Sequence, residues 1–212
     1  MRKNLFLAFE GIDGSGKSTQ SKLLAEKLKE TGLNVYHTTE PTDSPIGTMI
    51  RKIFRHEMEA DHRTIAGLYV ADRLDHLTNS KNGLLEKLDK GYTVISDRYY
   101  FSSYAYQGTH MPIDWVIAAN SQSAALLRPD LNIFIDVSPG ESIIRLNKRR
   151  TPIELYEGYE NLNNVRAKYF EAFEKLKNEE KIYIADGNRS IDRKSTRLNS
   201  SHSDLSRMPS SA

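Results

Sequence analysis

The sequence predicts an α/β fold in which a parallel sheet is covered by helices on both faces. Five short runs of β-branched or aromatic residues alternate with longer segments of helical periodicity. A glycine-rich loop of the form G-x-x-x-x-G-K-S, residues 11–18, joins the first run to the first helical segment. Strands that alternate with helices are linked by right-handed crossovers, which build a parallel sheet between two helical layers. The 212 residues suffice for one such domain.

The predicted strands and helices follow one another along the whole body of the chain. The five predicted strands are residues 5–9, 34–38, 93–96, 132–137 and 181–185. The clearest predicted helices are residues 19–31, 64–77, 82–90 and 154–178. Gly32 and Gly91 follow the first and third of these helices, as expected of a residue that readily takes the conformation which ends a helix.

Composition limits the cellular setting. The chain has no cysteine, which excludes disulfides and thiolate metal sites and suits a reducing compartment. No apolar stretch approaches the roughly 18 residues that a membrane-spanning helix needs. The first four residues, Met-Arg-Lys-Asn, lead into a strand and not into the apolar segment of a signal peptide. We therefore expect a cytoplasmic protein that has no membrane partner.

The last twenty residues differ from the rest. Residues 193–212 hold seven serines, four of the 30 basic residues and one of the 28 acidic residues, so the remainder of a chain of net charge +2 is close to neutral. No basic stripe remains to predict a nucleic-acid partner. The segment RKSTRLNSSHSDLSRMPSSA resembles a translated adapter sequence. We expect a kinase domain at residues 1–192 and a disordered, non-native tail at 193–212, with the native C-terminus missing beyond about Asp192.

The glycine-rich loop predicts a cradle for a polyphosphate. Its glycines permit backbone conformations and close approaches that turn successive N–H groups toward an anion. Lys17 adds a positive charge near the β and γ phosphates, and the hydroxyl of Ser18 can ligate Mg²⁺. The helix that opens at about Lys17 presents its positive end to the same anion. The predicted nucleotide-binding residues are Gly11, Ile12, Asp13, Gly14, Ser15, Gly16, Lys17, Ser18 and Thr19.

Polar motifs also follow the next two predicted strands. Thr39-Glu40-Pro41-Thr42 follows the second strand, and Asp97-Arg98-Tyr99 follows the third. Because parallel strands end at one edge of their sheet, we expect these motifs to lie beside the loop. Phosphoryl transfer requires cations around the reacting phosphate. Lys17 and Arg98 are therefore predicted to be catalytic. Asp97 is also predicted to be catalytic, as a ligand of the metal. The candidate metal ligands are Ser18, Asp97 and Asp13.

A basic run predicts a mobile lid. Arg145, Arg149 and Arg150 precede Pro152, which a helix does not easily pass, so residues of about 145–156 are expected to form a helix–loop–helix that closes over the site. An arginine brought to the γ-phosphate accelerates transfer by roughly 10³–10⁵. The cradle itself contains no arginine. Arg149 and Arg150 are therefore predicted to supply this charge.

Together these motifs resemble the thymidylate kinase family. The resemblance is carried by GIDGSGKST at 11–19, EPT at 40–42, YVADR at 69–73, DRY at 97–99 and SSYAYQG at 102–108. It implies a P-loop kinase fold with a five-stranded parallel sheet, and transfer of a phosphoryl group from ATP to dTMP with Mg²⁺. It also implies a homodimer. A lid arginine without one in the cradle resembles the bacterial members.

The resemblance further implies roles for residues that line the acceptor site. Tyr69 would stack on thymine, where many members have Phe, and Arg73 would hydrogen-bond the base. Arg98 and Arg51 would hold the acceptor phosphate. Tyr106 would lie near the 2′ position of the sugar.

The remaining implied positions complete that site. Ser103 and Gln107 would line the base pocket, and Asp13 would organise the acceptor phosphate and the metal. Many bacterial members have Arg where this chain has Thr39, and no role is assigned to Thr39. The implied substrate-binding set is Asp13, Glu40, Pro41, Arg51, Tyr69, Arg73, Arg98, Ser103, Tyr106 and Gln107.

Two other classes share the cradle. One is another P-loop nucleoside monophosphate or nucleoside kinase, such as a deoxynucleoside, adenylate or shikimate kinase, although Arg98 with Arg51 favours an acceptor that already bears a phosphate. The other is a nonenzymatic nucleotide-binding switch, which lacks support because residues 147–150, Asn-Lys-Arg-Arg, do not form the guanine-reading N-K-x-D motif. The histidines have no metal-ligand spacing, and His56, His62, His76 and His110 are expected at surface or loop positions.

Overall fold

The strands form one parallel sheet of five, in the order β2-β3-β1-β4-β5. The computed structural model describes residues 4–148 and 158–188. The strands are β1 (Phe6–Glu10), β2 (Val35–Thr39), β3 (Thr93–Asp97), β4 (Leu131–Asp136) and β5 (Ile182–Asp186). All five predicted strands are confirmed, each within one residue at either end.

Helices connect the strands. They are α1 (Lys17–Glu30), α2 (Pro45–Phe54), α3 (His62–Thr78), α4 (Leu84–Asp89), α5 (Tyr100–Tyr106), the 3₁₀ helix η1 (Gln107–Thr109), α6 (Ile113–Ala119), α7 (Ser121–Leu126), α8 (Pro139–Lys148) and α9 (Tyr159–Leu176). The four clearest predicted helices correspond to α1, α3, α4 and α9, although the start predicted for the last lies outside the described residues. The bounds of α2 were not predicted, although Arg51 lies in a stretch of helical periodicity, and the short helices α5, α6 and α7 were not predicted.

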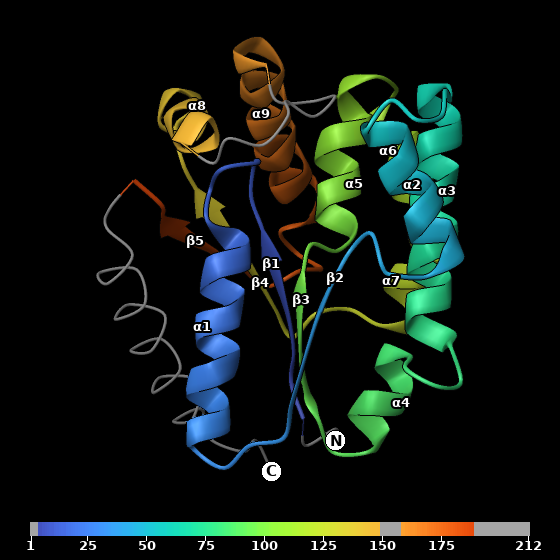
Figure 1. Ribbon diagram of the computed structural model, residues 1–212, viewed down its shortest axis with the longest axis vertical. Coiled ribbons are helices and arrows are strands. Elements are labelled where there is room, and N and C mark those ends of the chain that lie inside the picture. The colour runs from blue at the N-terminus through green and yellow to red at the C-terminus, as the bar shows by residue number, and fades with distance from the viewer. Residues whose placement is uncertain (1–3, 149–157, 189–212) are drawn as a thin grey trace.

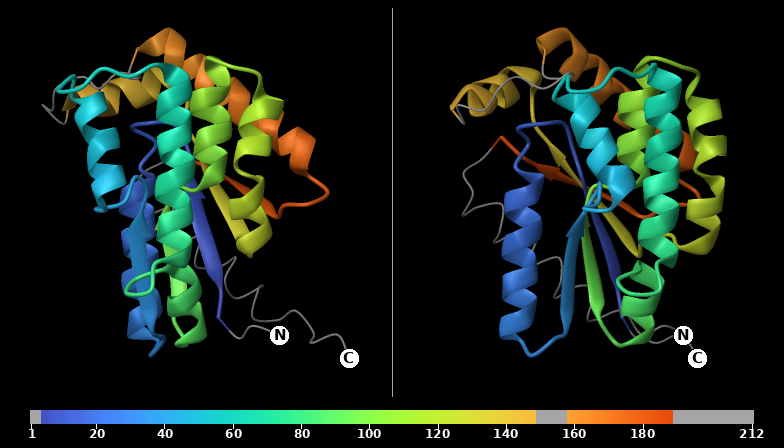
Figure 2. Two further views of the ribbon diagram at one scale, coloured as in Figure 1. Left: turned by 90° about the vertical axis from the view of Figure 1, so that its right-hand side faces the viewer. Right: turned by 45° about the vertical axis from the view of Figure 1, so that its right-hand side comes forward.

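The central strands of the sheet are covered on both faces, as predicted (Figure 1), whereas no residue of the edge strand β5 is fully buried. Leu7 and Phe9 of β1 pack with Leu24 of α1 on one face. Phe6 and Ala8 of the same strand belong to the larger core on the other face, which includes residues of α3, α4, α5, α6 and α9. Successive side chains of a strand point to opposite faces, so a strand buried on both faces reads as a continuous apolar run. Figure 2 shows the helical layer of α2 to α7 from two further directions.

The carboxyl ends of the central strands meet at one edge of the sheet. Phe9 of β1 and Thr39 of β2 both pair in register with Asp97 of β3. Helix α1 leads from β1 to β2, which lies beyond β3, whereas β4 lies on the other side of β1. The chain therefore reverses its direction of winding at β1, where open α/β sheets bind ligands. This topology brings the three motifs predicted from strand ends to the same edge.

Helix α8 contains the first part of the predicted lid. The rest of that lid, with Arg149 and Arg150, and the tail 193–212 lie outside the described residues. Within residues 4–148 and 158–188, no helix is both long enough and apolar enough to cross a membrane.

Candidate active site

The glycine-rich loop leaves β1 and enters α1 through left-handed backbone conformations. Gly14 has φ 77° and Gly16 has φ 92°. A Cβ at Gly14 would lie 2.7 Å from the carbonyl oxygen of Ser142 in α8, so any side chain there would collide with backbone. Gly16 caps α1 without a side-chain hydrogen bond, which leaves the first N–H groups of the helix available to an anion.

Lys17 is held inside this loop. Its Nζ donates to Oδ1 of Asp13 at 3.2 Å and to the carbonyl of Ile12 at 3.5 Å. Burial lowers the pKa of Lys17, and the neighbouring charge of Arg98 lowers it further. Both acceptors belong to the loop itself, so the amino group of Lys17 stays within the loop.

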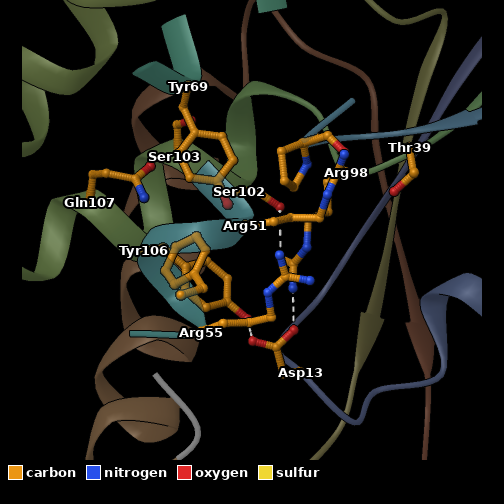
Figure 3. A pocket seen from close by; sticks show the side chains of 12 residues that line it. Asp13, Thr39, Arg51, Arg55, Tyr69, Arg98, Ser102, Ser103, Tyr106 and Gln107 are labelled. Atoms are coloured by element: carbon orange, nitrogen blue, oxygen red, sulfur yellow. Dashed lines mark hydrogen bonds and ion pairs between the residues drawn. The ribbon is translucent and has the colours of Figure 1, made fainter. Parts of the chain in front are cut away.

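Asp13 joins the loop to the residue that follows β3. Arg98 forms an ion pair with Oδ1 of Asp13, and the hydroxyl of Tyr106 donates to Oδ2 at 2.8 Å (Figure 3). Burial by itself would raise the pKa of Asp13, but Arg98 and Lys17 outweigh it and hold that pKa well below its usual range. One ionised carboxylate thus connects the lysine of the cradle to an arginine outside it.

Arg98 has a left-handed backbone conformation that residues other than glycine rarely adopt. Its φ is 74°, which costs on the order of 1–3 kcal/mol for a residue other than glycine. The N–H of Arg98 donates to the carbonyl of Phe9 at 2.8 Å, and Oγ of Ser96 donates to the carbonyl of Arg98 at 2.7 Å. Its Nη1 donates to Oγ of Ser102 at 3.2 Å, and its guanidinium lies 4.8 Å from the ring centre of Tyr106. These contacts fix the direction of the guanidinium.

A cavity of about 340 Å³ lies beside this arginine. Eight residues of the implied substrate-binding set line it: Asp13, Pro41, Arg51, Tyr69, Arg98, Ser103, Tyr106 and Gln107. Its volume falls in the range of small-molecule sites. Thr39, Phe54, Arg55 and Ser102 also line it and were not assigned from the sequence.

The cavity has a cationic side and an aromatic side. Arg51 of α2, which lines the cavity together with Arg98, donates from Nη1 to the carbonyl of Pro41 at 2.9 Å and pairs through Nη2 with Asp43 at 3.0 Å. The ring centres of Tyr69 and Phe54 lie 6.2 Å apart. In Figure 3, Tyr69 and the neighbouring polar side chains lie opposite Arg98. The arrangement suits a ligand with an anionic end and a flat, partly polar end.

Glu40 and Arg73 do not line the cavity but lie behind its wall. They form a buried ion pair with an Nη2–Oε2 distance of 2.7 Å, and each side chain is 1% exposed. Nη1 of Arg73 donates to Oγ of Ser103 at 3.1 Å and also to Asn120. Arg73 therefore reaches the cavity through Ser103, and its direct contact with a base stays a prediction.

His76 corrects an expectation. It is buried in α3 and not at a surface or loop position. Its Nδ1 lies 3.1 Å from Oε1 of Glu40, and its Nε2 lies 2.9 Å from Oγ1 of Thr38. His76 lies three residues after Arg73 on the same face of α3, so helical spacing alone contained the signal.

Helical spacing also explains two of the missed lining residues. Phe54 and Arg55 come three and four residues after Arg51, so they project from the same side of α2. The end of α2 was not predicted, although its start has a clear sequence signal. Ser44 accepts a hydrogen bond from the N–H of Gly47 and is followed by proline.

The loop and β3 offer oxygen atoms that suit Mg²⁺. Oδ1 of Asp97 is buried without a hydrogen-bond partner among the described residues, and Ser18 lies in the first turn of α1. The described ranges contain no group of three or more His, Cys, Asp or Glu arranged around a metal. Mg²⁺ commonly uses one or two carboxylates with phosphate oxygens and waters, so Ser18 and Asp97 fit it. Both oxygens of Asp13 already accept from cations or a phenol, which fits an organising role better.

An anion cradle with a buried lysine, beside a cavity lined by Arg51 and Arg98, is the arrangement expected of a P-loop phosphotransferase. Comparison with known proteins gives the family. The profile described as thymidylate kinase matches residues 9–197. The chain belongs to the thymidylate kinase family and is an enzyme of that kind.

Relatives from several organisms match most of the chain. A "Probable thymidylate kinase" of Pyrococcus horikoshii is 40% identical over 178 residues, covering 81% of this chain and 84% of the relative. A "Thymidylate kinase" of Leptospira borgpetersenii is 35% identical over 170 residues, covering 80% and 81%. A "Probable thymidylate kinase" of Methanococcus aeolicus is 38% identical over 167 residues, covering 78% of each. The expected bacterial type is not supported, because archaeal relatives match at least as well as this bacterial one.

Proposed function

We propose that the protein transfers the γ-phosphoryl group of ATP to dTMP, giving ADP and dTDP. The observation that carries this proposal is the Asp13 carboxylate, which pairs with Lys17 of the phosphate cradle and with Arg98 of the cavity. Two cations that share one carboxylate lie close enough to hold donor and acceptor phosphates end to end. Positioning of that kind supplies most of the catalysis in phosphoryl transfer.

The donor is held by the loop. Its N–H groups and Lys17 bind the β and γ phosphates of ATP. Ser18 and Asp97 are the residues that would hold Mg²⁺ together with phosphate oxygens, and the ion would supply positive charge to offset the charge that develops on the transferred group. Arg149 or Arg150 of the lid adds a further cation at the γ-phosphate.

The acceptor phosphate lies between Arg98 and Arg51. A phosphate monoester is already largely ionised at neutral pH, so no general base is needed to activate it. Asp13 orients Arg98 and Lys17 and leaves their outer N–H groups to the two phosphates. The chain therefore contributes cations and orientation, and not proton transfer.

The base occupies the aromatic side of the cavity. Tyr69 stacks on thymine, and Ser103 and Gln107 offer hydrogen bonds to its edge. Arg73 orients Ser103 from behind the wall. Tyr106 lies near the 2′ position of the sugar.

Further properties are proposed from family membership. These are a homodimer, a cytoplasmic location, and a single kinase domain within residues 1–192 whose lid closes over ATP.

A coupled assay of ADP release tests the activity. The full chain is given ATP and Mg²⁺ with dTMP, dUMP, dCMP, AMP or thymidine. We expect turnover of dTMP and a preference over dUMP of about 10- to 200-fold in kcat/KM, the discrimination that one methyl group provides in an apolar pocket. Turnover of thymidine but not of dTMP would refute the proposal. Nucleotide binding without ADP release from any acceptor would favour a switch.

A further inference from the structure

Glu10 is a buried carboxylate at the junction of β1 and the phosphate loop. It is the last residue of β1, and it is 0% exposed. It does not line the cavity. Burying a carboxylate is unfavourable unless hydrogen bonds compensate, so its partners indicate what it does there.

Those partners surround Arg98. Oε1 of Glu10 accepts from the N–H of Tyr99 at 2.9 Å. Oε2 accepts from Oγ of Ser102 at 2.6 Å and from the hydroxyl of Tyr169 at 2.9 Å. All three donors require an acceptor, and an ionised carboxylate provides only acceptors.

The first of these bonds acts on the backbone of Arg98. The N–H of Tyr99 belongs to the peptide that follows Arg98, whose φ is 74°. The other peptide is fixed by the bond from Arg98 N–H to Phe9. Glu10 and the carbonyl of Phe9 therefore hold the two peptides on either side of Arg98 and so stabilise its left-handed backbone conformation.

The second bond acts on the guanidinium. Because Ser102 directs its hydroxyl proton to Glu10, an oxygen lone pair is left for Nη1 of Arg98. If Glu10 were an amide, its single oxygen could accept from the N–H of Tyr99 or from the hydroxyl of Ser102 but not from both, so one of the two restraints on Arg98 would be lost. One carboxylate thus determines both the backbone and the side-chain direction of the same arginine.

We propose that Glu10 is a positioning residue for the acceptor phosphate, acting through the Arg98 backbone and through Ser102 on the Arg98 guanidinium. This inference rests on the proposed function, in which Arg98 holds the phosphate of dTMP. It predicts that Glu10 affects binding of a phosphate-bearing acceptor and not binding of the nucleoside alone.

Binding measurements on Glu10→Gln test the inference. The Kd of dTMP and the Ki of thymidine are measured at about pH 8.5 for the wild type and the variant. We expect the Kd of dTMP to rise about tenfold or more, the effect of losing a hydrogen bond to a charged group. The Ki of thymidine and the KM of ATP should not change. In an Arg98→Ala background, Glu10→Gln should cause no further loss of dTMP affinity.

Glu180→Gln is a matched control. Glu180 is also a buried carboxylate, accepting from Tyr100, Arg128 and Asn132, but it precedes β5 and so lies at the opposite edge of the sheet. Its substitution should leave the Kd of dTMP unchanged. If Glu10→Gln is not folded by circular dichroism, Glu10→Asp takes its place, because the shorter side chain withdraws the carboxylate from the N–H of Tyr99 and from the hydroxyl of Ser102.

Each outcome is decisive. An unchanged Kd of dTMP in a folded Glu10 variant would overturn the inference, and so would equal losses for dTMP and thymidine. An additive loss in the Arg98→Ala background would show that Glu10 does not act through Arg98. If the wild type itself neither binds nor turns over dTMP, the proposed function fails instead.

Discussion

Replacing Glu10 by glutamine should make the stability of the protein less sensitive to pH. Burial raises the pKa of Glu10 from 4.5 to about 7, although Ser102, Arg98 and Tyr169 act to lower it. The charged and titratable groups that face it are Arg98 after β3, Tyr104 of α5 and Tyr169 of α9. Between the two pKa values the folded state binds more protons than the unfolded state, so stability must fall as pH rises.

The size of the effect follows from the two pKa values. Each pKa unit corresponds to about 1.4 kcal/mol, so ionising the buried Glu10 carboxyl costs about 3 kcal/mol of stability once the pH is above 7. Between about pH 5 and about pH 8 the wild type should lose roughly 2–3 kcal/mol that the glutamine variant keeps. A change of this size is a large part of the stability of an ordinary domain.

Urea denaturation at several pH values measures the difference between variant and wild type. Burial lowers the pKa of His37 and of His110, and their contribution is lost as pH falls; it is common to both proteins and cancels in the difference. Asp61→Asn is the matched control, because hydrogen bonds from Arg63 lower the pKa of Asp61 to about 2, below the range studied. The difference in free energy of unfolding between Asp61→Asn and the wild type should not change with pH.

If the difference in free energy of unfolding between Glu10→Gln and the wild type did not change with pH, the raised pKa of Glu10 would be refuted. This result would mean that the Glu10 carboxyl is ionised in the folded state across the whole range. The three hydrogen bonds and the charge of Arg98 would then outweigh burial. A difference that falls with rising pH would show a pKa lowered by those groups.

Three further results are expected. Lys17→Ala should abolish dTMP-dependent ADP release while Lys27→Ala, on the exposed side of α1, leaves it unchanged; activity in the first variant would exclude Lys17 from the transition state. Arg149→Ala or Arg150→Ala should lower kcat more than dTMP affinity, because a lid cation acts mainly in the transition state, and equal losses in rate and binding would contradict this role. Asp97→Asn should raise the Mg²⁺ concentration needed for half-maximal rate, measured by Mg²⁺ titration, and an unchanged requirement would remove Asp97 as a ligand.

The sheet could be predicted because its signals are local. Each strand is a short apolar run between turn residues, and alternation with helices determines that the sheet is parallel. Short helices such as α5 and α7 could not be predicted in this way. All seven residues of α5 are buried, so no polar face reveals its period.

The site was predictable where motifs follow strands and less so where contacts depend on packing. Asp13 and Arg98 follow β1 and β3, and topology brings them together. The sequence does not reveal that Arg73 is covered by Glu40 and Asn120, because these partners come from distant segments. Glu10 was overlooked for a similar reason, since a single acidic residue at the end of an apolar strand gives no sign of donors 89 to 159 positions away.

Glu10 and Asp13 lie three residues apart, yet burial and charge shift their pKa values in opposite directions. Asp13 contacts two cations directly, so their charges outweigh burial. Glu10 meets Arg98 mainly through Ser102 and the backbone, so burial dominates. The chain therefore keeps Asp13 ionised in the phosphate loop, whereas Glu10, at the end of β1, is buried where ionisation is unfavourable. Glu10→Gln is therefore expected to stabilise the protein at neutral pH and to weaken dTMP binding. The reason is that the buried charge of Glu10 destabilises the fold and also orients Arg98.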